Sequence, residues 1–193
     1  MNNSFDVLER VIISRRSIKP AALNGQKIGE DKIKALLELA NWAPTHGFTE
    51  PWRFVVFSGD AIPRFCQRNA EMYKETTKPE KFSSAKYEKQ LDNGDKASHI
   101  IAVYLKRGSN PNITMLEEIC AVAAAVQNIL LGAGALGIAV LWSTGGAVLL
   151  PAMEEYLGID EEDIMIGLLY MGYTDEPAKT GRRTPIEDKI KWM

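Results

Sequence analysis

Residues 119–142 form the longest apolar stretch of the chain, and its small side chains restrict the fold more than any other feature. Just before it, Thr114 is followed three residues later by Glu117, which is the capping-box pattern of a helix start. The pattern predicts a long alanine-rich helix over residues 115–131 that can pack closely against a neighbouring element. Two amides and three glycines within the stretch argue against a membrane span. Since the amino end also lacks the features of a signal peptide, the sequence favours a soluble cytoplasmic protein.

Short segments rich in β-branched and aromatic residues alternate with helical patterns along the rest of the chain. We predict strands over residues 53–58, 99–105, 138–143 and 164–170. We predict helices over residues 5–14, about 33–40, 61–73, 115–131 and 151–157. Residues 74–96 are dense in lysine and glutamate, and we expect a solvated segment without assigning its structure. The interleaving predicts one α/β or α+β domain over residues 1–193, with a small central sheet covered by helices.

Composition and charge exclude several classes of function. The chain has 193 residues, which suits about one domain. Its 23 basic and 25 acidic residues argue against nucleic acid as a partner, because binding phosphates needs a basic excess. Cys66 and Cys120 lie far apart and only two histidines are present, so we expect neither a disulfide framework nor a metal site.

The run from Gly132 through Gly134 to Gly137 matches the GxGxxG pattern of dinucleotide-binding turns. In those turns the glycines follow a strand and open a helix, whose first N–H groups bind phosphate. Here a predicted helix precedes the glycines and a strand follows them. Helix termination and close packing therefore explain this run better than phosphate binding.

Arg15-Arg16-Ser17 follows the first predicted helix and offers two guanidinium groups and a hydroxyl. Such a group can hold a phosphate through bidentate, charge-assisted hydrogen bonds. The alternative is a solvated helix end, where cations interact favourably with the helix dipole. Taken alone, the segment favours the second interpretation.

Residues 42–52 form a stiff, aromatic-rich connection that contains two tryptophans, two prolines and His46. Loops of this kind often carry ligands on a rigid scaffold. His46 could donate to a ligand oxygen or simply to a carbonyl of its own loop. Trp142-Ser143-Thr144, followed by two glycines, similarly suits either a polar ligand or a tight turn.

In this order, and in a chain of this size, these segments resemble the nitroreductase family of FMN-dependent oxidoreductases, in particular its short, minimal branch. No single motif carries the resemblance, which covers nearly the whole chain and is weakest over residues 74–96. The matching segments are Arg15-Arg16-Ser17, residues 43–54, the long small-residue helix, Gly134 to Ile138, Trp142 to Gly145, residues 168–173 and Arg182-Arg183-Thr184-Pro185.

The resemblance implies an α+β fold around a central mixed sheet, assembled as a homodimer with FMN at the subunit interface. It implies that the FMN phosphate and ribityl groups contact Arg15, Arg16 and Ser17, and that a tail arginine, Arg183, also contacts phosphate. The flavin would meet Trp142, Ser143 and Thr144 of one chain and Trp42 and His46 of the other. Gly132, Gly134 and Gly137 correspond to a segment proposed to contact the nicotinamide cofactor.

The activity implied by the resemblance is hydride transfer from NADH or NADPH through FMN to a small planar acceptor, such as a nitroaromatic or a quinone. It agrees with a sequence in which no acid, base or nucleophile constellation is evident, because the flavin carries the chemistry. Two alternatives remain open: a non-catalytic flavin-binding carrier or sensor, and an interaction domain without cofactor in which Arg15 and Arg16 are surface charges.

Two residues depart from the family pattern. Many relatives have Asn and Gln where this chain has Phe48 and Glu50. An ionised Glu50 facing the flavin would disfavour the anionic reduced ring, because like charges repel. The departure leaves the preferred electron acceptor open.

Overall fold

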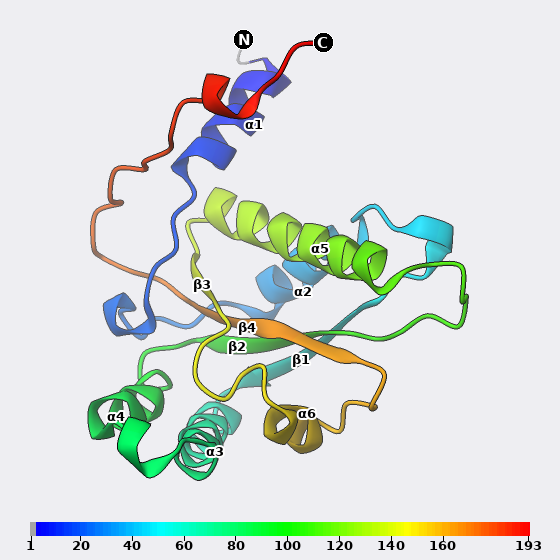
Figure 1. Ribbon diagram of the computed structural model, residues 1–193. Coiled ribbons are helices and arrows are strands. Elements are labelled where there is room, and N and C mark those ends of the chain that lie inside the picture. The colour runs from blue at the N-terminus through cyan, green and yellow to red at the C-terminus, as the bar shows by residue number, and fades with distance from the viewer. Residues whose placement is uncertain (1–2) are drawn as a thin grey trace.

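The computed structural model describes residues 3–193 and shows helices on both faces of a four-stranded sheet (Figure 1). The strands are β1 (Trp52–Ser58), β2 (His99–Leu105), β3 (Ala139–Ser143) and β4 (Ile164–Gly172), in the spatial order β1-β2-β4-β3. All three strand pairs are antiparallel. The predicted α+β class is confirmed, and the parallel component found within residues 3–193 is a single bridge between Ser17 and Val140 of β3.

Residues 3–193 form six α-helices. They are α1 (Ser4–Ser14), α2 (Glu30–Asn41), α3 (Ala61–Thr76), α4 (Ser84–Asp92), α5 (Met115–Ala135) and α6 (Pro151–Leu157). Helices α2 and α5 cover one face of the sheet, α3, α4 and α6 lie on the other, and α1 projects away from the body (Figure 1). Because helices cover both faces of the sheet, a ligand at the edge strand β3 can contact residues of either helical layer.

The central strand β2 explains how the two layers are held. It is buried on both faces, as its continuous apolar sequence predicts. Ile101 and Val103 pack into the core beneath α2 and α5, whereas Ile100 and Ala102 pack into the core beneath α3 and α6. This alternation is the two-residue period of a strand, and it places one hydrophobic core on each side of the sheet.

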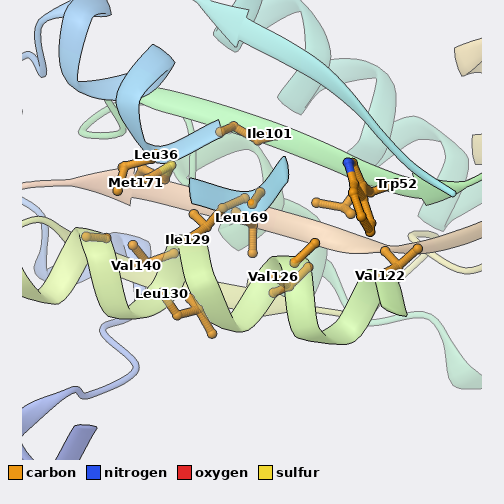
Figure 2. Packing of buried hydrophobic residues seen from close by; sticks show 14 of the residues in the cluster. Leu36, Trp52, Ile101, Val122, Val126, Ile129, Leu130, Val140, Leu169 and Met171 are labelled. Atoms are coloured by element: carbon orange, nitrogen blue, oxygen red, sulfur yellow. The ribbon is translucent and has the colours of Figure 1, made fainter. Parts of the chain in front are cut away.

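Helix α5 is the centre of the first core and shows the predicted capping box at Thr114 and Glu117. Its residues Val122, Val126 and Ile129 face the sheet, where Ile101 and Leu169 meet them (Figure 2). By length and composition α5 could cross a membrane, but here one apolar face of the helix is buried against the sheet and α2. The cytoplasmic location stays a prediction.

The predicted end of α5 at residue 131 is wrong, because the helix continues to Ala135. Gly132 remains helical and lies against α2, where a Cβ atom would come within 2.8 Å of both Leu36 and Leu39. The helix stops at Gly137, whose φ of +69° suits glycine, and the Ile138 N–H donates to the Ala133 carbonyl at 2.8 Å. Gly132 thus allows close packing against α2, whereas Gly137 supplies the left-handed backbone that terminates the helix.

Residues 74–96, left unassigned from sequence, are mostly helical. Helix α3 continues to Thr76, and α4 begins after Ser83, whose side chain accepts from the Lys86 N–H. The two helices pack as a hairpin, and the rings of Tyr73 and Phe82 stack at 5.7 Å at the turn. Smaller differences are a third strand that begins at Ala139 and a fourth that extends to Gly172.

A buried ion pair fixes the amino end of α5. Glu118 is 1% exposed, and its carboxylate accepts from the Arg107 guanidinium and, at 3.0 Å, from the Gly108 N–H. The same guanidinium donates to the Ile113 carbonyl at 2.5 Å. These bonds close the connection from β2 to α5.

We expect Glu118→Ala to lower the free energy of unfolding by about 3–5 kcal/mol, because it leaves the Arg107 charge without its buried partner. The control is Asp160→Ala, which removes an exposed pair with Lys106 and should change the free energy of unfolding far less, because solvent screens exposed charges. Urea unfolding at one protein concentration compares the two. Equal losses in both variants would contradict the importance of the buried pair.

Candidate functional site

The Arg15-Arg16-Ser17 segment lies along the free edge of β3. Beyond the end of α1, Ser17 forms its parallel bridge with Val140, and the Ile18 N–H donates to the Val140 carbonyl at 3.1 Å. This pairing brings a basic segment from the amino end of the chain to an edge strand formed more than 120 residues later. The arginines are thereby attached to the sheet.

A cavity of about 140 Å³ lies beside this segment. Its wall includes Arg15, Arg16, Gly134 and Gly137, together with the first residues of β3. The structure thus brings together the arginine segment and two of the three predicted nicotinamide-contact glycines. Gly132, the third, faces α2 instead.

The Arg16 guanidinium connects α1 to the C-terminal segment. It donates to the carbonyls of Ile13 at 2.6 Å, Arg15 at 2.9 Å and Lys179 at 2.6 Å. The first two bonds are those of a cation at a helix end, the simpler interpretation of this segment. The third draws the tail past Arg16, and a Cβ atom at Gly181 would lie within 2.6 Å of that guanidinium. The tail that carries Arg183 therefore passes beside the arginine segment, and Arg183 itself is exposed.

A second cavity of about 350 Å³ lies at the other end of β3, between the α3–α4 hairpin and the turn that follows Ser143. It is lined by Asn69, Tyr73, Lys86, Lys89, Gln90, Asn93, Ser143, Gly145, Gly146 and Tyr170. No carboxylate is among these residues, and two of them are lysines. The cavity is thus polar and positively charged.

Two amide oxygens of this second cavity are buried without a hydrogen-bond partner, Asn69 Oδ1 and Gln90 Oε1. Asn69 itself is only 2% exposed. Buried polar atoms usually have partners, so these two oxygens are acceptors available to a donor in the cavity. Burial also raises the pKa of the Tyr170 phenol, which stays protonated as a donor at neutral pH.

Sequence reasoning missed most residues of the second cavity, because residues 74–96 received no assigned structure. A signal was present: Lys86, Lys89, Gln90 and Asn93 follow the three- and four-residue spacing of one helix face. Only the fold shows that this face meets Ser143.

Trp142 and Ser143 point to opposite faces of the sheet, as neighbours in a strand must. Ser143 lines the second cavity, whereas Trp142 packs toward the α5 side and its indole N–H donates to the Ile166 carbonyl at 3.3 Å. Gly167 makes room for this ring, because a Cβ atom there would lie 2.3 Å from the indole nitrogen. Thr144 is exposed at the end of the strand.

His46 lies at the opposite end of α5 from the arginine segment, whereas Trp42 lies beside the middle of the helix, where the Leu39 carbonyl accepts from both the Trp42 N–H and the Asn128 amide. Trp42 ends α2 and is 79% exposed, and His46 begins a short 3-10 turn, His46–Phe48. The His46 ring is bound to Glu117, in the first turn of α5. The 17 residues from Glu117 to Gly134 span about 26 Å of helix. Within one chain His46 therefore does not reach the arginines.

Glu50 and Phe48 occupy the same connection. Both have left-handed backbones, with φ of +42° and +53°, and both side chains are exposed. Glu50 lines a groove with Asn41, Trp52 and other residues of α2 and β1. In the single chain this carboxylate lies outside both cavities at β3.

Comparison with known proteins identifies the family of the chain. A curated protein of Bacillus subtilis, named as an NAD(P)H nitroreductase, is 25% identical over 99% of this chain and 96% of its own. The crystal structure of a nitroreductase-like family protein from Bacillus cereus has a TM-score of 0.82, 25% identity and coverage of 100% and 97% of the two chains. The FMN-dependent nitroreductase of Mycobacterium smegmatis, solved with NADPH, shares the fold with a TM-score of 0.75 at 19% identity, covering 99% and 100%. The Nitroreductase family model matches residues 12–173. The chain therefore belongs to the nitroreductase family.

Proposed function

We propose that this chain is an NAD(P)H-dependent FMN oxidoreductase whose flavin lies along the free edge of β3. The observation that carries the proposal is the pair of cavities at the two ends of this strand, one lined by arginines and one by amides and lysines. From Val140 to Ser143 the strand spans about 10 Å. This length suits a ligand with an anionic group at one end and a polar ring at the other. In this proposal the chain acts as one domain, because both cores share the one sheet.

The second cavity fits the pyrimidine side of a flavin ring. That side carries an N–H group between two carbonyl oxygens, so it needs both acceptors and donors. Asn69 Oδ1 and Gln90 Oε1 are acceptors without partners, and the lysines, the Ser143 hydroxyl and the Tyr170 phenol can donate. Lys86 and Lys89 would also favour negative charge on a reduced ring, because opposite charges attract.

The first cavity fits the phosphate. Arg15 and Arg16 supply guanidinium groups that suit bidentate binding of phosphate oxygens, and the tail adds Lys179, Arg182 and Arg183 nearby in the sequence. In this proposal Arg16 holds both the phosphate and the tail. Ser17 supplies a hydroxyl at the point where the segment joins β3.

The proposed site is completed by a second copy of the chain. Because His46 lies about 26 Å along α5 from Gly134, antiparallel pairing of two α5 helices would bring it toward the partner's arginines. Exposed apolar side chains support pairing: no residue of α1 is buried, and large apolar patches mark interfaces. These exposed side chains are Phe5, Leu8, Ile12, Ile13, Leu39, Trp42, Leu116, Leu136, Ile186, Ile190 and Trp192.

The residues of this chain bind and orient, while FMN when bound supplies reversible acceptance of a hydride. The arginines hold the phosphate, and the amides orient the ring through its polar edge. The Tyr170 phenol, whose pKa burial raises further above neutral pH, can donate to the ring. The pairing of two chains would exclude water from the ring. Gly134 and Gly137 remain candidate contacts for NADH or NADPH, and the acceptor is proposed to be small and planar, such as a nitroaromatic or a quinone.

We expect anaerobic addition of NADH or NADPH to bleach the flavin absorbance of the FMN-loaded protein, and a quinone or nitroaromatic to restore it. Stopped-flow absorbance measures both steps. Bound FMN that neither nicotinamide bleaches would instead favour the flavin carrier or sensor. Protein that takes up no FMN would favour the interaction domain.

We expect Arg15→Ala and Arg16→Ala each to weaken FMN binding roughly 10- to 150-fold, the loss of a charge-assisted hydrogen bond of about 1.5–3 kcal/mol. Riboflavin, which lacks the phosphate, should bind all variants about equally, and Arg10→Ala is the control on the exposed surface of α1. Fluorescence titration compares the two ligands. Equal weakening of riboflavin and FMN would contradict the assignment of these arginines to phosphate.

A further inference from the structure

The connection between α2 and β1 is tied to the start of α5 by the ring of His46. His46 Nδ1 lies 2.9 Å from Glu117 Oε1. An ionised carboxylate only accepts hydrogen bonds, so the proton of this bond belongs to Nδ1. When the ring is neutral, Nε2 is then an acceptor, because the bond made by one ring nitrogen decides the state of the other.

Glu117 is held in place by its second oxygen. Oε2 accepts from the Thr114 N–H at 2.8 Å and from the Thr114 hydroxyl at 3.0 Å. Hydrogen bonds from Thr114, with that from His46, lower the pKa of Glu117, so the carboxylate is ionised at neutral pH. The Glu117 carboxylate that caps α5 therefore also accepts a hydrogen bond from the His46 ring at a fixed position.

Backbone geometry and hydrogen bonds hold the rest of the connection between α2 and β1 in one conformation. Gly47 is left-handed with φ of +58°, and a Cβ atom there would lie 2.8 Å from the Ile113 side chain. The Thr45 hydroxyl lies 3.1 Å from that of Thr49 and accepts from the Glu50 N–H at 3.2 Å. Left-handed backbone at non-glycine residues is unfavourable and tends to persist at functional sites.

The His46–Glu117 pair is exposed in the single chain, with side chains 62% and 42% exposed. Exposed ion pairs contribute little to stability. The cap of α5 needs Glu117 and Thr114 but does not need His46. The hydrogen bond from His46 to the Glu117 carboxylate therefore adds little stability. Orientation of the His46 ring explains this bond better.

We propose that Glu117 is a positioning residue that holds His46 with Nδ1 protonated, which leaves Nε2 to accept a hydrogen bond from an N–H or O–H group of the partner's bound flavin. The hydrogen bond from the flavin to Nε2 rests on the proposed function. Which nitrogen of the His46 ring carries the proton does not depend on the proposed function, because it is a property of the chain without ligand.

The chain provides an internal control, since its two histidines should carry their protons on opposite nitrogens. His99 is buried beside Ser98, whose hydroxyl accepts from the Ile28 N–H at 2.7 Å. We expect that hydroxyl, with one lone pair already used, to donate to His99 Nδ1, 3.0 Å away, which puts the ring proton on Nε2. Burial lowers the pKa of His99, so this ring is neutral at neutral pH.

Long-range ¹H–¹⁵N NMR of the flavin-free protein at about pH 8 tests the proposal directly. We expect His46 protonated on Nδ1 and His99 on Nε2. Glu117→Ala should remove the Nδ1 preference of His46 and leave His99 unchanged. Thr114→Ala, which weakens the same cap but keeps the carboxylate, should leave both rings unchanged. Wild-type His46 protonated on Nε2, or an Nδ1 preference that survives Glu117→Ala, overturns the proposal.

Flavin titration tests the destination of Nε2. We expect Glu117→Ala and His46→Ala each to weaken FMN and riboflavin equally, by roughly tenfold for one neutral hydrogen bond, and Thr114→Ala to change neither by more than about twofold. Wild-type flavin affinity in a Glu117→Ala protein that has lost the Nδ1 preference overturns the assignment of Nε2 to flavin. A wild-type protein that binds no flavin defeats the proposed function instead, and the NMR result on Glu117 is unaffected.

Discussion

The packing of α5 against the sheet and α2 determines where His46 and the arginine-lined cavity lie. Gly132 allows α2 to approach closely, and the buried Arg107–Glu118 pair fixes the opposite end of the helix. At its amino end α5 holds His46 through Glu117, and at its carboxyl end it forms a wall beside Arg15. A helix that rises about 1.5 Å per residue separates these groups by more than the length of a flavin. In the proposed function the two halves of the site therefore come from different copies of the chain.

The free edge of β3 provides the other constraint. An edge strand offers unpaired backbone groups, and here the segment after α1 pairs with one of them at Val140. The remainder of the strand leads to Ser143 and the cavity with unpartnered amides. Side chains of successive residues alternate, so Trp142 supports the strand from the α5 side while Ser143 faces the cavity. A single short strand thus connects the phosphate end of the proposed cradle with its ring end.

Much of the fold could be predicted from local patterns. The period of apolar residues and the capping box at Thr114 identified the strands and α5, because these signals are local. The end of α5 could not be predicted, because Gly132 is tolerated in the helix only through its contact with α2. The α3–α4 hairpin was missed because its stability comes from tertiary contacts, such as Tyr73 with Phe82, within a strongly charged sequence.

The candidate site was predictable only in part, for a similar reason. Guanidinium groups and a tryptophan beside glycines are distinctive in any sequence, and they pointed to Arg15, Arg16 and Trp142. Amides such as Asn69 and Gln90 are common on surfaces and become informative only once burial leaves them without partners. The role of Glu117 toward His46 was hidden because the capping box already explained that residue.

The central claim, that each flavin site is built from two chains, is tested most directly by mixing protomers. A heterodimer of one Arg16→Ala chain and one His46→Ala chain combines both defects in one site and leaves the other site intact. We predict that the heterodimer regains wild-type FMN affinity at half of its sites, although each homodimer binds weakly. Weak binding at all sites of the heterodimer would contradict the account.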